Sequence, residues 1–185
     1  MRIITGLARG KRLQTPSGLH TRPTTDRVKE SLFNIIQTRI PDCVFLDLFS
    51  GSGAIGLEAA SRGAKKVIIC DKSKDAFHII KKNIEKTHME EQTECYHLSY
   101  EKLLETKINE KLDIIYIDPP YKTGLIYESL KIILSKELLN DDSLIIIETD
   151  EEERIIEKIK KIELDIVDQR KYGRAHLIFL KNKIN

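Results

Sequence analysis

From Cys43 onward the chain alternates between two patterns of hydrophobic residues. Continuous apolar runs such as CVFLDL, KVIICD, LDIIYID and SLIIIET predict buried strands, and the segments between them repeat apolar residues at helical spacing. Strands this apolar are typical of a parallel sheet covered by helices on both faces. The last two runs, ELDIVDQRKY and AHLIFLK, are joined at Gly173 by a turn too short for a parallel crossover. The pattern therefore predicts an α/β fold that ends in an antiparallel pair.

The first 23 residues follow a different pattern. RIITGLARGKRL reads as two short strand pieces around a glycine-containing turn, which predicts a small hairpin, and TPSGLHTRP reads as a loop. A helix is then expected to begin at Thr24 or Thr25. Its buried face is expected to carry Val28, Leu32, Ile35 and Ile36. We therefore expect an N-terminal hairpin and loop over residues 1–23 and a main domain over residues 24–185, forming one globular unit.

Charge is distributed unevenly along the chain. Residues 1–29 have a net charge of +6 and the remainder −4, although the whole chain is only +2. The basic residues of this segment are Arg2, Arg9, Lys11, Arg12, Arg22, Arg27 and Lys29. A basic arm on a mildly acidic body indicates a polyanionic partner, with an ordinary solvated surface as the alternative.

Composition narrows the class of protein. A chain of 185 residues can bury one α/β core, and it has neither a signal-peptide pattern nor an apolar run long enough to span a membrane. We therefore expect a cytoplasmic protein, with a monomer as the default. The three cysteines form no C-x-x-C pair and the five histidines are scattered, so buried structural thiols and no metal site are expected.

The segment DLFSGSGAIG, from Asp47 to Gly56, carries the strongest functional signal. Its last six residues have the spacing G-x-G-x-x-G, which follows a predicted strand and opens a predicted helix. Asp71 ends the next strand, about 20 residues further on, where an acid accepts hydrogen bonds from ribose hydroxyls. The combination predicts a nucleoside ligand rather than a simple tight turn.

Asp47 helps to choose among nucleoside ligands. A carboxylate close to a bound pyrophosphate would be repelled by on the order of 4 kcal/mol at an effective dielectric constant near 20. S-Adenosylmethionine has an ammonium group and a sulfonium group instead, so the sequence favours this methyl donor over NAD. Alternatively, Asp47 bonds backbone groups near the loop, and the two roles are compatible.

A second motif, Asp118-Pro119-Pro120-Tyr121, ends the fourth predicted strand. Ligands of open α/β sheets lie beyond the carboxyl ends of the strands, so this motif is expected to face the same crevice as the glycine-rich loop. Consecutive prolines stiffen the segment and can direct the Asp118 carboxylate and the Pro119 carbonyl to one point. Two such acceptors suit the exocyclic amine of an unpaired nucleobase, with Tyr121 stacking on the ring.

These motifs, together with RIITGLARGKRL, RPTTDRVKESLFN, SGSGAIGLEAASRGA and KYG, resemble the bacterial 16S ribosomal RNA guanine-N2 methyltransferase family. The resemblance runs over nearly the whole chain and implies a seven-stranded, Rossmann-like class I methyltransferase sheet with an antiparallel last strand. It also implies transfer of a methyl group from S-adenosylmethionine to guanine N2 in small-subunit (16S) rRNA, either free or in a partly assembled particle.

The resemblance assigns expected roles to individual residues. Asp118, Pro119, Pro120 and Tyr121 would hold the guanine. The cofactor would contact Asp47, Phe49, Ser50, Gly51, Ser52, Gly53, Asp71, Lys72 and Ser99. RNA phosphates would contact Arg2, Arg9, Lys11, Arg12, Arg22 and Arg27. The family more often has Glu where this chain has Asp71, and an acidic or amide residue where it has Ser99.

Other interpretations remain open at this point. The same Asp-Pro-Pro-Tyr motif can serve an adenine-N6 methyltransferase acting on DNA or RNA, although 185 residues leave little room for a separate DNA-recognition domain. A non-catalytic RNA-binding assembly factor and a hydride-transfer enzyme are further alternatives. The segment KKNIEK is interpreted as a solvated helix face, with a functional contact by Lys82 or Asn83 as the alternative.

Overall fold

Helices and strands alternate along the chain in the order that the hydrophobic pattern predicts. The computed structural model describes residues 1–16, 26–119 and 123–183. The strands are β1 (Val44–Asp47), β2 (Lys66–Asp71), β3 (Thr93–His97), β4 (Leu112–Ile117), β5 (Leu139–Thr149), β6 (Leu164–Tyr172) and β7 (Ala175–Asn182). The helices are α1 (Asp26–Ile35), the 3-10 turn η1 (Gln37–Arg39), α2 (Ala54–Ser61), α3 (Lys74–Thr87), α4 (Tyr100–Thr106), α5 (Thr123–Ser135) and α6 (Glu152–Ile159).

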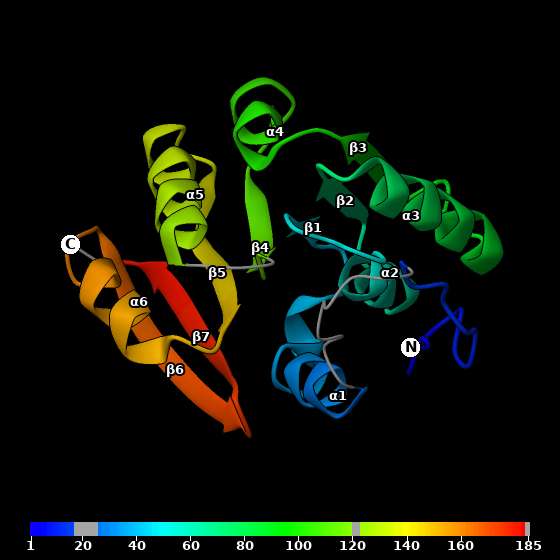
Figure 1. Ribbon diagram of the computed structural model, residues 1–185, viewed down its shortest axis with the longest axis horizontal. Coiled ribbons are helices and arrows are strands. Elements are labelled where there is room, and N and C mark those ends of the chain that lie inside the picture. The colour runs from blue at the N-terminus through cyan, green and yellow to red at the C-terminus, as the bar shows by residue number, and fades with distance from the viewer. Residues whose placement is uncertain (17–25, 120–122, 184–185) are drawn as a thin grey trace.

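The strands form one seven-stranded sheet with the order β3-β2-β1-β4-β5-β7-β6 (Figure 1). Neighbours from β3 to β5 pair in parallel, whereas β7 is antiparallel to both β5 and β6. The strand order reverses between β1 and β4, which makes this the switch point of the sheet. The expected Rossmann-like sheet with an antiparallel last strand is confirmed.

Both faces of the sheet are buried, because successive residues of each central strand enter different hydrophobic clusters. In β1, Phe45 belongs to the cluster beneath α1, α2 and α3, and Leu46 belongs to the cluster beneath α4, α5 and α6. Figure 1 shows these two groups of helices on opposite sides of the sheet. None of the described helices is long and apolar enough to cross a membrane.

Helix α1 differs from its prediction in which residues it buries. Val28, Leu32 and Ile36 are buried as expected, but Ile35 is 39% exposed and Phe33 takes its place in the core. The start expected at Thr24 or Thr25 lies outside the described residues. The helical repeat explains this difference. Phe33 lies three residues before Ile36 and therefore on the same face of the helix, which is the buried one.

The N-terminal hairpin is present as a single antiparallel bridge between Arg2 and Arg12. Its backbone bonds include Ile3 N donating to Lys11 O at 3.0 Å and Leu13 N donating to Met1 O at 2.9 Å. Three hairpin side chains are buried in the same cluster as α1, α2 and α3, namely Ile3, Ala8 and Leu13. The hairpin therefore packs onto the body of the protein.

Buried charge fixes the hairpin to α2. The Glu58 carboxylate accepts hydrogen bonds from Ile4 N at 2.8 Å and Thr5 N at 3.0 Å. It also lies 3.2 Å from Lys29 Nζ and 2.8 Å from Arg62 Nε. Lys29 and Glu58 are fully buried, so Lys29 does not belong to the basic surface that its position in the sequence suggests. Burial lowers the pKa of Lys29, and the Glu58 carboxylate opposes that shift.

We expect Glu58→Ala to lower the free energy of unfolding by about 3–5 kcal/mol, because it leaves the buried Lys29 ammonium without its counter-charge. Urea unfolding measures the loss. Glu105→Ala, on an exposed position of α4, is the control and should change stability by less than about 0.5 kcal/mol. Equal losses in the two variants would contradict the assigned role of the Glu58–Lys29 pair.

Candidate active site

The two predicted motifs meet where the order of strands reverses. Asp47, the last residue of β1, pairs in register with Tyr116 of the adjacent β4. Leu48 N extends this pairing by donating to Tyr116 O at 3.1 Å. Asp118 follows two residues after Tyr116, so the carboxyl ends of both strands bring Asp47 and Asp118 to one edge. This switch point is where open α/β sheets bind ligands.

The glycine-rich loop turns from β1 into α2 through two residues with positive φ. Gly51 has φ of +56° and Gly53 has φ of +76°, a backbone region that other L-residues rarely adopt. Gly53 N donates to Ser50 O at 2.8 Å and closes the turn. Gly56 has a different role, because a Cβ there would lie 2.8 Å from Ile69 Cγ1. Its absence lets α2 pack closely on β2, as the third glycine of this motif does.

The Asp47 carboxyl is buried beneath this loop, with 1% of the residue exposed. Its Oδ2 accepts a hydrogen bond from Gly56 N at 3.0 Å. Burial raises the pKa of Asp47 to about 7, the Gly56 bond opposes the shift, and the neighbouring Asp71 charge adds to it. Asp47 therefore bonds the backbone near the loop, as the alternative interpretation expected. A cation bound nearby would lower its raised pKa, because a positive charge favours the ionised carboxylate.

Asp71 lies on the other side of the loop, at the end of β2. Its Oδ2 accepts from Gly51 N at 2.9 Å and its Oδ1 accepts from Ser73 N at 2.8 Å. The carboxylate thus connects the first glycine of the loop to the start of α3. Lys72 is exposed, and its carbonyl lies 3.1 Å from His97 Nε2.

Phe49 and Ser99 lie on the side of β1 and β2 that α4 covers. The ring of Phe49 contacts Tyr100, with 5.4 Å between centroids. Ser99 is the N-cap of α4, and its Oγ accepts from Lys102 N at 3.4 Å. Burial acts to raise the pKa of Glu101, but hydrogen bonds, one of them from Ser99, outweigh it and the pKa is lowered. The local role of Ser99 is therefore to begin a helix.

Acidic groups crowd around Asp118. Burial raises its pKa well above the ordinary value, and the charges of Glu148, Asp47 and Asp150 raise it further. Tyr116 Oη donates a short hydrogen bond to Glu148 Oε2. Sequence reasoning missed Glu148, although it nearly ends the apolar run of β5 and could have been found by the rule that located Asp118. Burial, together with the nearby like charges, makes Asp118 a stronger base than an ordinary aspartate.

Several predicted contact residues lie elsewhere or outside the described chain. Arg2, Arg9, Lys11 and Arg12 are on the hairpin, and Arg27 is exposed on α1. Arg2 Nε lies 3.6 Å from Asp26 Oδ2 across the hairpin–α1 junction. Pro119 directly follows Asp118 and is half-buried. Pro120, Tyr121 and Arg22 lie outside the described residues.

The three cysteines have thiols that resist ionisation. Cys43 and Cys70 are buried as expected, whereas Cys95 is half-exposed. Cys95 lies on β3, the edge strand of the sheet, and packs partly buried against the hydrophobic cluster. Burial raises the pKa of each of the three thiols to about 12. Across residues 1–16, 26–119 and 123–183, no cluster of His, Cys, Asp and Glu could hold a metal ion.

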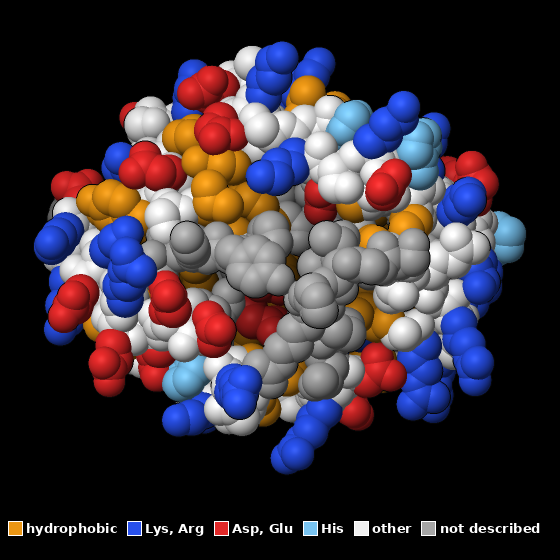
Figure 2. Space-filling model, in the orientation of Figure 1, with side chains coloured by type: hydrophobic (Ala, Val, Ile, Leu, Met, Phe, Trp, Pro, Cys, Tyr) orange, Lys and Arg blue, Asp and Glu red, His pale blue; other side chains and the backbone are white. Residues whose placement is uncertain are grey.

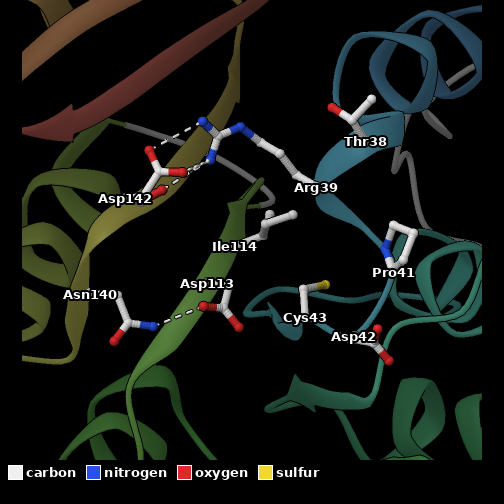
Figure 3. Close-up of a pocket in the computed structure, with 9 residues that line it drawn as sticks. All are labelled: Thr38, Arg39, Pro41, Asp42, Cys43, Asp113, Ile114, Asn140 and Asp142. Atoms are coloured by element: carbon white, nitrogen blue, oxygen red, sulfur yellow. Dashed lines mark hydrogen bonds and ion pairs between the residues drawn. The ribbon is translucent and has the colours of Figure 1, made fainter.

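A cavity of about 310 Å³ lies at the opposite, amino-terminal edge of β1, β4 and β5. Figure 3 shows two pairs among its polar side chains, Arg39 with Asp142 and Asn140 with Asp113. Asp113 Oδ2 also accepts from Val44 N at 2.7 Å. Because these groups satisfy one another and lie away from the carboxyl ends of the strands, we assign this edge to stability.

The reversed strand order, the antiparallel β7 and the glycine-rich loop define the class I methyltransferase fold. The solved structure of yhhF from Escherichia coli has a TM-score of 0.83 with this chain at 26% identity, covering 100% of this chain and 99% of that one. The chain matches the family model described as conserved hypothetical protein 95 over residues 1–181, and it belongs to that family.

Curated relatives agree with this placement. YlbH of Bacillus subtilis is 34% identical over 187 residues, which is 99% of this chain and 100% of that protein. Ribosomal RNA small subunit methyltransferase D of Haemophilus influenzae is 35% identical over 158 residues, covering 84% of this chain and 82% of that protein.

The raised pKa of Asp47 predicts a dependence of stability on pH. The folded state keeps a proton on this carboxyl up to about pH 7, whereas the unfolded chain releases it near 3.8. The free energy of unfolding should therefore fall as pH rises between these values. Asp47→Asn keeps an acceptor for Gly56 N but cannot ionise, so it should remove this part of the decline, on the order of a few kcal/mol.

Urea unfolding at several pH values between about 4 and 7 tests this expectation. Asp75→Asn, on an exposed position of α3, is the matched control and should leave the pH profile of the natural protein intact. If Asp47→Asn also retains that profile, the decline arises from another group.

Proposed function

We propose that this protein transfers a methyl group from S-adenosylmethionine to the exocyclic N2 amine of a guanine in small-subunit ribosomal RNA. The observation that carries the proposal is the meeting of Asp118 with the glycine-rich loop at the β1–β4 switch point. Similarity to the ribosomal RNA small subunit methyltransferase D of Haemophilus influenzae supports ribosomal RNA of the small subunit as the substrate. The choice of guanine N2 as the target atom rests on the resemblance of the sequence motifs to the guanine-N2 methyltransferase family.

The residues around the loop fit this methyl donor. Among the described residues, nothing would lie within 4 Å of a Cβ at Gly51, so the space beside this glycine is open. It leaves room for a ligand against the backbone. Asp47 and Asp71 lie on either side of the loop, an acidic environment suited to an ammonium group and to ribose hydroxyls but not to a pyrophosphate. When bound, S-adenosylmethionine would supply the electrophilic methyl group.

The chain's own contribution to the reaction centres on Asp118. The lone pair of a guanine amine is delocalised into the ring, so the amine must be held and oriented before it attacks. The Asp118 carboxylate and the Pro119 carbonyl would accept its two N–H bonds and stabilise the positive charge that develops on nitrogen. The raised pKa of Asp118 also suits it to take the proton that the methylated nitrogen releases.

Methylation of purified 16S rRNA and of DNA with a labelled donor tests the proposal. We expect label in rRNA, recovered as N2-methylguanine after digestion to nucleosides. Asp118→Ala should lower the rate by about 100-fold or more while leaving S-adenosylhomocysteine binding intact. Calorimetry with S-adenosylhomocysteine and with NAD separates the methyl donor from the dinucleotide.

The other outcomes identify the alternatives. Label recovered as N6-methyladenine would indicate an adenine methyltransferase. RNA binding without methyl transfer, on free rRNA and on partly assembled small-subunit particles, would indicate an assembly protein. Unimpaired transfer by Asp118→Ala at saturating donor would show that Asp118 is not the catalytic residue.

The carboxylates around Asp118 predict the pH profile of the reaction. Asp118 accepts N–H bonds best when ionised, so the rate should fall as pH decreases through its raised pKa. Glu148→Gln removes a neighbouring negative charge but keeps an acceptor for Tyr116 Oη. It should lower the pKa of Asp118 and move this acidic limb to lower pH. The control is Glu153→Gln, at an exposed position, which should leave the limb in place. An unmoved limb in Glu148→Gln would assign the titration to another group.

A further inference from the structure

Asn83, in the middle of α3, links two segments that are distant in the sequence. Its side chain is fully buried, contrary to the solvated face expected for KKNIEK. Asn83 Oδ1 accepts from Gln14 N at 2.8 Å, and Nδ2 donates to Gln14 O at 2.9 Å. The same Nδ2 donates to Ser52 O at 2.9 Å. One amide therefore holds the end of the N-terminal hairpin and the centre of the glycine-rich loop.

The chemistry of these bonds requires an amide at this position. Both N–H bonds of Nδ2 are used, each to a main-chain carbonyl, and the oxygen faces a main-chain N–H. This pattern also fixes which side-chain atom is nitrogen and which is oxygen. A carboxylate would lose both donors and face two carbonyl oxygens. An aliphatic residue would leave Gln14 N, Gln14 O and the buried Ser52 O without this partner.

Fixing the hairpin does not explain the bond to the loop. The hairpin already has two other anchors on α2, Glu58 and Ser61, and Ser61 Oγ accepts from Ala8 N at 2.9 Å. In the part of the chain that the structure describes, neither side chain bonds to the loop. In contrast, α3 packs directly beneath the loop, since a Cβ at Gly53 would lie 3.3 Å from Ile80 Cγ2. Asn83 thus bonds to the loop from α3, and the same helix also bonds to the hairpin.

The surface above this junction is basic. Lys82 and Lys86 are exposed on α3, and Arg9 and Arg12 are exposed on the hairpin. Lys11 Nζ of the hairpin donates to Lys86 O at 2.9 Å, which brings the two elements together. Figure 2 shows Lys and Arg side chains gathered at the lower right, where Figure 1 places the hairpin beside α3. Phosphates bound there would restrain the hairpin and α3 together.

We propose that Asn83 is a positioning residue that couples RNA binding at the hairpin to cofactor binding at the glycine-rich loop. The inference rests on the proposed function. RNA that restrains the hairpin also restrains the Asn83 amide, and with it the Ser52 carbonyl. The loop then has less freedom to lose when the cofactor binds, so each ligand strengthens binding of the other.

Two variants separate coupling from simple anchoring. Asn83→Asp removes both donors and disturbs the hairpin and the loop, whereas Ser61→Ala loosens the hairpin alone. We measure S-adenosylhomocysteine affinity by calorimetry and affinity for a 16S rRNA transcript by filter binding. Asn83→Asp should weaken both ligands, each by about tenfold. Ser61→Ala should weaken RNA and leave S-adenosylhomocysteine within about twofold.

Coupling itself is measured by repeating the calorimetry with RNA present. RNA should strengthen S-adenosylhomocysteine binding by about fivefold in the natural protein and not at all in Asn83→Asp. Asn83→Ser, which lacks the buried charge, repeats the test if the aspartate variant does not fold. Gln14→Ala is the matched control, because Gln14 bonds through its main chain, and it should behave like the natural protein.

The outcomes distinguish the two proposals. If the natural protein binds no S-adenosylhomocysteine, the proposed function fails and the coupling fails with it. If the natural protein binds both ligands but Asn83 and Ser61 variants lose the same affinity, Asn83 is only a hairpin anchor. Retention of the RNA effect in the Asn83 variants would also overturn the coupling.

Discussion

The site depends on one constraint of backbone geometry, the reversal of strand order between β1 and β4. On either side of this point the chain leaves the sheet towards opposite neighbours, and this is the place where open α/β sheets bind ligands. Two acidic residues from distant parts of the sequence, Asp47 and Asp118, meet there. Burial of both faces of the sheet holds the strands in register, and hydrophobic packing therefore sets the geometry of the polar groups.

This arrangement has an electrostatic cost. Burial raises the pKa of both Asp47 and Asp118, and the charges of Glu148 and Asp47 raise the pKa of Asp118 further. In the absence of a cation such a cluster weakens the fold as its members ionise. A positively charged ligand would reverse the balance. The acidic cluster is thus easier to understand as part of a binding site than as a contribution to stability.

Much of the architecture could be predicted because apolar runs identify buried strands directly. The motifs at the strand ends were equally readable, since the sheet direction places them on one edge. What could not be predicted depends on tertiary contacts. Lys29 looked like part of a basic arm but is buried against Glu58, a partner 29 residues away. Asn83 looked solvated because KKNIEK is polar, yet Ile80 and Ile84 mark the same helix face as buried.

The candidate site lies at the carboxyl-terminal edge of the sheet, and this leaves the amino-terminal edge open to practical use. Asp142, near the start of β5, has a side chain that is 76% exposed. It lies six residues from Glu148, about 20 Å along an extended strand. The native thiols, with pKa values of about 12, react slowly with maleimides at neutral pH. A cysteine at position 142 would give up the ion pairs of Asp142 with Arg39 and Lys181. It would in return accept a fluorophore or a surface tether selectively, on the side of the molecule facing away from the chemistry.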